Sequence, residues 1–303
     1  MASTSEHIRL YDLVKPHDPE TVLTEVRYLL SLMLPDGDFS FVETLYADII
    51  QLFQGSFPGF RECTTKYHDL EHTSSVLLSF MRLLHGAHVH GVAVSESGIL
   101  TGACCALFHD TGLIQTTDDR KGTGAKYSVG HEYRSSDFAR QYLRERGFPR
   151  QFAADCATVI LSTMVELPFG EILFRNEELR LLGQILGTAD VLAQMADRSY
   201  LEKLLLLYQE FQEAGIPGFD TELTLLEKTE GFYKDIAKTK LDKEFGNVKR
   251  YMKLHFLHRW NMNKDLYEES IKNNIAYLKT ILDSHRQTYR SMLRRGGIVA
   301  RLD

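Results

Sequence analysis

The sequence has few of the patterns that mark a β-sheet protein, a membrane protein or a secreted protein. Strict alternation of polar and apolar residues is almost absent, and only residues 88–94 and 169–174 favour short extended segments. No apolar run approaches the ~18 residues of a membrane span, so no membrane partner is expected. Residues 1–7 lack a basic region followed by an apolar one, which argues against a signal peptide. These absences predict a cytoplasmic protein.

The sequence also has few cysteines and no excess of positive charge. Of the four cysteines, Cys104 and Cys105 are neighbours in an apolar stretch, which is typical of buried thiols in a reducing compartment rather than of disulfides. Lysine and arginine number 35 against 41 aspartates and glutamates, so the formal net charge is −6. Because nucleic-acid-binding proteins are usually basic, no nucleic-acid partner is expected.

What the sequence does contain is helical periodicity over most of its length. Apolar residues recur every three or four positions, and Pro35, Gly147 and the segment 215–218 interrupt them. The pattern predicts an all-α fold. Helices are expected over residues 19–34, 41–53, 69–84, 97–110, 131–146, 150–163, 177–196, 198–214, 220–236, 243–256 and 264–292. Residues 86–91, next to His85, are expected to form a histidine-bearing loop, and residues 111–130 a mobile surface loop.

Histidine and aspartate cluster in two short segments. His68 and His72 lie four residues apart, so on one helix they would project from the same face. His109 and Asp110 end the apolar run 102–108, where an uncompensated charge would be costly. A metal ion shared with His72 would satisfy both groups.

A fourth ligand is expected from Asp190, which stands alone among apolar residues of a predicted helix. His72, His109, Asp110 and Asp190 together form a mixed nitrogen and oxygen set. Such a set suits a divalent ion such as Mn²⁺, Fe²⁺, Zn²⁺ or Mg²⁺, with one or two ions in the site. Gln194, four residues after Asp190 on the same helical face, is a candidate for the pocket rim.

The order of these residues resembles the ligand pattern of the HD superfamily of metal-dependent phosphohydrolases. That pattern is a histidine, a histidine–aspartate pair and a distant aspartate, which here fall on His72, His109–Asp110 and Asp190. Residues 67–72, Tyr-His-Asp-Leu-Glu-His, are also similar to the Tyr-His-Asn-x-x-His segment of cyclic-nucleotide phosphodiesterases. The resemblance implies a multi-helix bundle of the HD-domain, phosphodiesterase-like kind. It further implies that His68 is the general acid and that His131 binds a second metal ion or a phosphate.

The resemblance also suggests how the chain is divided. Residues 61–215 would form the phosphohydrolase core, residues 1–60 would pack on it as N-terminal helices, and residues 216–303 would form a C-terminal helical extension continuous with the same domain. Leu113 stands where the phosphodiesterases carry a further histidine, and no purine-reading glutamine is evident at residues 240–243. The identity of the substrate therefore stays open.

The expected function is hydrolysis of a phosphoester in a small, nucleotide-like substrate. Two alternatives remain at this point: a di-iron oxygenase on the same scaffold, and a non-catalytic module that senses a nucleotide. The broad apolar surface of residues 200–211 predicts either core burial or a homodimer seam. The basic segment 238–264 suggests a solvated helix face or a surface that attracts anions.

Overall fold

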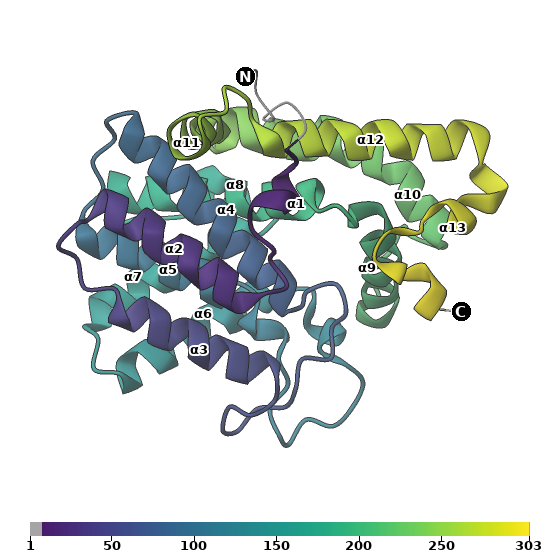
Figure 1. The fold of residues 1–303 in the computed structure, drawn as a ribbon. Helices are drawn as coiled ribbons and strands as arrows, with labels where there is room; N and C mark the ends of the chain where they lie inside the picture. The colour runs from purple at the N-terminus through teal and green to yellow at the C-terminus, as the bar shows by residue number, and fades with distance from the viewer. Residues whose placement is uncertain (1–7, 303) are drawn as a thin grey trace.

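The computed structural model describes residues 8–302, and the expectation of an all-α fold is confirmed there (Figure 1). Within this range the extended structure is limited to one isolated bridge between Phe60 and Thr116. The helices are α1 (Leu10–Leu13), α2 (Pro19–Met33), α3 (Ser40–Phe53), α4 (Leu70–Val89), α5 (Glu96–Phe108), α6 (His131–Glu145), α7 (Arg150–Ile160), α8 (Glu177–Ala196), α9 (Tyr200–Ala214), α10 (Glu222–Gly231), α11 (Tyr251–Trp260), α12 (Leu266–Ser284) and α13 (Tyr289–Met292). None of these helices combines the length and hydropathy of a bilayer-spanning segment.

Several helices begin at a polar side chain that satisfies free backbone N–H groups. Asp69 accepts a hydrogen bond from the backbone N–H of His72 at the start of α4. Ser95 and Asn176 cap α5 and α8 in the same way. Such caps typically contribute about 1 kcal/mol each. They also set the rotation of each helix, and therefore the direction in which the following residues point.

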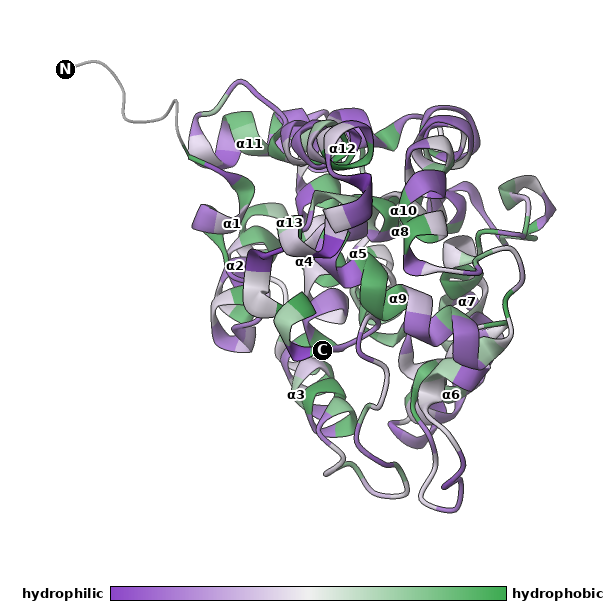
Figure 2. Ribbon diagram, turned by 90° about the vertical axis from the view of Figure 1, so that its right-hand side faces the viewer, coloured by the Kyte–Doolittle hydropathy of each residue, from purple (hydrophilic) through white to green (hydrophobic). Residues whose placement is uncertain are grey.

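Helices α4 and α5 form the centre of the bundle. α4 packs against α2, α5, α8 and α11, and almost every residue from His72 to Ala87 is buried. α5 is apolar on all sides, which is the pattern of a helix without a face toward water. Figure 2 shows hydrophobic and hydrophilic residues side by side along outer helices such as α3 and α6. The central helices therefore supply a rigid frame for any side chain placed at their ends.

The C-terminal helices pack directly on this frame. α12 crosses one end of the bundle beside α8, and α11 lies against α4 (Figure 1). Most of the apolar surface of α9 packs into the core of this chain, because Leu201, Leu204 and Leu205 are buried. A homodimer stays a prediction.

The predicted loop after α4 is wrong. The helix continues to Val89, so His85 and His88 are helical and His90 is the C-terminal cap. Gly86 does not break the helix, because it is a packing position: a Cβ atom there would lie 2.0 Å from the carbonyl oxygen of Tyr251 in α11. The extended segment predicted from residue 88 is therefore not found, and residues 169–174 contain the short 3-10 turn Phe169–Glu171 instead.

Two other predicted segments also differ from the structure. Residues 111–130 are not a simple surface loop, because they contain the helical turns Thr111–Leu113 and Gly124–Tyr127 and bury Ile114. The helix predicted over 243–256 begins only at Tyr251, after π-helical and 3-10 turns.

The basic segment 238–264 is not a continuous solvated face. Lys240 is buried and donates to the carbonyl oxygens of Met164 and Leu167. Arg259 forms an ion pair with Glu25, which is also buried. Part of this positive charge is therefore used within the fold.

Candidate metal centre

The ends of three helices meet the middle of a fourth at the candidate site. His72 lies in the first turn of α4, and His109 and Asp110 directly follow α5. Asp190 projects from the middle of α8, and His131 is the first residue of α6. Gly130 is the N-cap of α6 and has a left-handed conformation (φ 79°), so this helix has no side-chain cap. The four predicted metal ligands come together although 118 positions separate His72 from Asp190.

The donor atoms of these residues converge closely. His72, His109 and Asp110 offer atoms that all lie within 4.8 Å of one another. Nε2 of His72 is 3.4 Å from Nε2 of His109 and 3.4 Å from Oδ2 of Asp110. Nε2 of His109 is 3.2 Å from the same Oδ2 atom. Asp190 approaches from α8, with Oδ1 3.3 Å from Nε2 of His72.

This spacing fits the coordination shell of a divalent ion. Ligands bound at ~2.1 Å are separated by roughly 3.0 Å in octahedral and 3.4 Å in tetrahedral geometry. The Oδ2 atom of Asp110 is buried and has no hydrogen-bond partner among the described residues, although it faces two imidazole nitrogens. An orphaned buried carboxylate oxygen is costly unless a cation compensates it. The His72–His109–Asp110 group could therefore hold a metal ion.

Backbone carbonyl groups select the imidazole tautomers that the site needs. Nδ1 of His109 is 2.9 Å from the carbonyl oxygen of Ala106, and Nδ1 of His131 is 2.9 Å from that of Ser128. Because a carbonyl oxygen only accepts hydrogen bonds, each Nδ1 must carry the proton. Whenever the ring is neutral, its lone pair therefore lies on Nε2, which is the atom directed at the carboxylates.

Asp110 lies between two groups of histidines. Its Oδ2 atom faces His72 and His109, whereas its Oδ1 atom is 3.2 Å from Nε2 of His131. Glu132 is next to His131, with a carboxylate oxygen 3.5 Å from Nδ1. This arrangement is compatible with a carboxylate that bridges two ions, because each oxygen has its own imidazole neighbour.

His68 lies beside the same site, although not as expected. It precedes the cap residue Asp69 and is outside α4, so the two histidines do not share a helix face. Its ring centroid is nevertheless 5.8 Å from that of His72 and 5.9 Å from that of His131. The extended conformation of Asp69 separates His68 from the first turn of α4.

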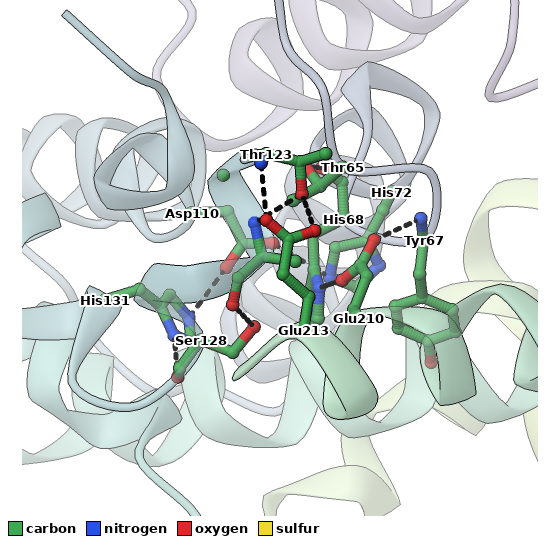
Figure 3. Close-up of polar contacts among 12 residues, drawn as sticks. Thr65, Tyr67, His68, His72, Asp110, Thr123, Ser128, His131, Glu210 and Glu213 are labelled. Carbon is green, nitrogen blue, oxygen red and sulfur yellow. Dashed lines mark hydrogen bonds and ion pairs between the residues drawn. The ribbon is translucent and has the colours of Figure 1, made fainter. Parts of the chain in front are cut away.

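Glu210 of α9 holds His68 in place and was not identified from the sequence. One carboxylate oxygen lies 2.6 Å from Nδ1 of His68, and the other accepts the backbone N–H of Tyr67 at 2.7 Å (Figure 3). Glu210 is buried, although its sequence neighbours Gln209 and Gln212 are polar. The sequence around Glu210 therefore gave no signal that this carboxylate is buried and needs a partner.

The carboxylates determine the electrostatics of the site. Burial alone would lower the pKa of His109 and of His131, but neighbouring carboxylates, Asp110 above all, outweigh it and raise each pKa to about 9. Burial is likewise outweighed at His68, where Glu210 raises the pKa. For Asp110, burial would raise the pKa, but the imidazoles of His109 and His131 hold it well below its usual value. The pocket thus stabilises positive charge.

Gln194 lines a small pocket that also includes His72 and Tyr67. Asp197, one turn further along, is held by Lys203 at 2.6 Å rather than by its neighbour Arg198. The predicted rim position of Gln194 is therefore next to a candidate ligand.

Comparison with known proteins places the chain in a family. The family model described as Npun_R2479-like matches residues 38–242, more than half of the chain, and the chain belongs to that family. The matched range contains all the candidate ligands as well as His68 and His131. A search of curated proteins gave no match.

Proposed function

We propose that the protein is a metal-dependent phosphohydrolase of the HD type that cleaves a phosphoester in a small, nucleotide-like substrate. The observation that carries the proposal is the convergence of His72, His109 and Asp110 on one point, with the orphaned oxygen of Asp110 among them and Asp190 beside His72. The order of these residues along the chain resembles the HD pattern, and the all-α bundle is compatible with it. The free thiols of Cys63, Cys104, Cys105 and Cys156 favour the cytoplasmic location expected from the sequence.

His72, His109, Asp110 and Asp190 would hold the ion, with Asp110 and His131 available to a second one. A bound divalent ion supplies a Lewis acid for a phosphoryl oxygen and lowers the pKa of a bound water toward ~7. Asp110 and Asp190 provide the negative charge that keeps such an ion in the site.

His68 is the proposed general acid for the leaving oxygen. Glu210 occupies its Nδ1 atom, so Nε2 is the nitrogen that remains for the substrate. Glu210 also holds the backbone of Tyr67 and thereby positions the ring. Proton donation of this kind typically contributes ~10²–10⁴-fold to the rate.

The position of His131 favours a second candidate function. Its contact with Oδ1 of Asp110 would complete a two-ion site, and two irons in such a site can activate oxygen. The oxygenase lacks the further histidine ligands it would need, whereas the phosphohydrolase accounts for His68 and Glu210 as well. A non-catalytic nucleotide sensor would leave the His68–Glu210 pair without a role.

The test is elemental analysis of the purified protein, followed by a panel of mononucleotides and cyclic nucleotides assayed with the metal that is found. We expect one or two divalent ions per chain and hydrolysis of at least one phosphoester. Oxygen uptake with bound iron and no hydrolysis would support the oxygenase. Nucleotide binding without turnover would support the sensor.

His68→Ala separates the proposed roles. The variant should retain its metal and lose ~10²–10⁴-fold in turnover, whereas the exposed His90→Ala should match the wild type. Loss of the metal in His68→Ala would contradict the assignment of His68 as an acid rather than a ligand.

A further inference from the structure

A cavity runs along α4 from beside the candidate metal centre, at Glu71 and Ser75, to Arg82. Its volume is about 920 Å³, and it is bounded by α4, α8 and α12, by the segment 9–17 and by the C-terminal segment 294–301. Arg82 lies in its wall, ten residues after His72, which corresponds to ~15 Å along the helix. A cavity of this size accommodates a ligand as large as a nucleotide.

Arg82 is the most unusual residue of this wall. It is only 1% exposed, and its Nη1 atom donates to the hydroxyl of Tyr267 at 3.0 Å. Its Nε and Nη2 atoms are buried and have no hydrogen-bond partner among the described residues. The rings of Phe256 and Tyr267 lie 5.8 Å from its guanidinium carbon but supply no negative charge. A guanidinium group buried without an anion is unfavourable, and a bidentate oxyanion would satisfy both free donors.

Among the described residues, the guanidinium groups of the other arginines in the wall also lack carboxylate partners. Within residues 8–302, no carboxylate oxygen lies within 4.0 Å of the guanidinium groups of Arg9, Arg82, Arg198, Arg294, Arg295 and Arg301. The three acidic residues of the wall are each paired with a lysine: Glu71 and Asp197 with Lys203, and Glu269 with Lys264. The cavity is therefore strongly positive in a chain whose net charge is −6.

We propose that this cavity binds a phosphorylated small molecule with several negative charges. Arg82 would take one phosphate, and the arginines of the two terminal segments would contact the remaining charges. Arginine suits this task because its planar donors match the oxygens of a phosphate. The site does not depend on the proposed hydrolase function, although Ser75, Asp197 and Lys203 line both this cavity and the small pocket beside His72.

The experiment measures binding of tripolyphosphate to the full-length protein by calorimetry in the presence of EDTA. We expect saturable binding to the wild type and a dissociation constant that is roughly 10- to 100-fold higher in Arg82→Met. Arg140→Met, which removes an exposed arginine of α6, is the matched control and should bind as the wild type does. Absence of binding to the wild type, or equal binding to Arg82→Met, would overturn the proposal.

A second variant covers the case in which Arg82→Met does not fold, and a second anion tests whether the site prefers phosphate. If Arg82→Met fails to fold, the exposed Arg198→Met should still weaken binding by roughly 3- to 10-fold. Citrate tests the assignment of phosphate, because it carries similar charge on carboxylates, and equal affinity for citrate would refute that assignment. Asp110→Asn should bind tripolyphosphate normally, so failure of the hydrolase proposal is distinguishable from failure of this one.

Discussion

The two ends of α4 lie in opposite electrostatic surroundings. At the N-terminal end, carboxylates raise the pKa values of His109 and His131 to about 9, although desolvation opposes the charge on both rings. Toward the C-terminal end, burial lowers the pKa of His85 to about 4 and that of His255 well below its usual value, and nearby cations including Arg259 add to the effect. The same side chain in the same bundle is therefore favoured as a cation at one end and as a neutral ring at the other.

The contrast shows that burial alone does not determine the charge of a site. Both regions are desolvated, and desolvation disfavours any charged group. Asp110 and Asp190 overcome this effect for cations at one end, whereas the Arg82 cavity contains no free carboxylate among its described residues. The first region is thus suited to a metal ion and the second to an anion.

The largest effect is expected from Asp110→Asn, which removes the central negative charge of the metal centre with little change in shape. Metal affinity should fall by more than ~100-fold and hydrolysis should fall with it. Elemental analysis and turnover measurements check this. The exposed loop variant Asp118→Asn is the control and should behave as the wild type. Full metal content in Asp110→Asn would show that the negative charge of Asp110 is not what suits the N-terminal end of α4 to a metal ion.

Acid should destabilise the fold through His85. Between pH 6.5 and pH 4 the unfolded chain binds a proton that the folded ring does not, because the pKa of His85 is about 4 in the fold and ~6.5 in the unfolded chain. The stabilisation is therefore complete above pH 6.5 and is lost as the pH falls toward 4. We expect this residue to lower the free energy of unfolding by up to about 3 kcal/mol over that range.

Urea unfolding at a series of pH values measures this contribution. His85→Asn, which cannot take up the proton, should show a shallower decline in stability with falling pH. The exposed His90→Asn should keep the wild-type slope. An unchanged slope in His85→Asn would show that His85 is not held neutral.

Glu210→Gln should weaken catalysis without disturbing the metal. Glutamine preserves the shape and can still accept the N–H of Tyr67, but it no longer holds His68 through a charge. We expect kcat to fall roughly 10-fold with KM and metal content unchanged. Glu213→Gln, one turn further on α9 and bound to Thr123, is the control and should retain activity. An effect confined to KM would indicate a substrate contact instead.

The smallest effect is expected from Gln194→Ala. Gln194 lines the small pocket beside His72 but is not a candidate ligand. Loss of one neutral contact should raise KM by about 3- to 10-fold and leave kcat and metal content unchanged. Steady-state kinetics on the best substrate of the panel measures this. Loss of metal from this variant would instead assign Gln194 to the metal centre.

Much of the helical architecture follows from local patterns. The range predicted for the Asp190 helix, residues 177–196, coincides with α8, because Asn176 caps its start and its apolar residues keep a helical period. The end of α4 was mispredicted because Gly86 resembles a helix breaker. Its lack of a side chain instead allows the backbone of α11 to approach, and that contact arises only in the tertiary structure.

In the candidate site, too, some residues could be identified from the sequence and others only from the packing of the helices. His109, Asp110 and Asp190 could be selected from the sequence because each is polar in an apolar segment, and His72 because its place in the chain resembles the HD ligand pattern. Glu210 could not be assigned to His68, since 142 positions separate them and nothing local relates α9 to the start of α4.

The sequence by itself determined that the chain is helical, which side chains are too polar for the apolar segments that carry them, and that those side chains need a partner. These properties are local, because helical period and desolvation depend on near neighbours. Only the tertiary structure decided which groups meet: His131 with Asp110, Glu210 with His68, and the arginines of both terminal segments with Arg82 in one cavity wall. Contacts between distant segments depend on how whole helices pack, and the packing of α4 against α8, α11 and α12 sets them.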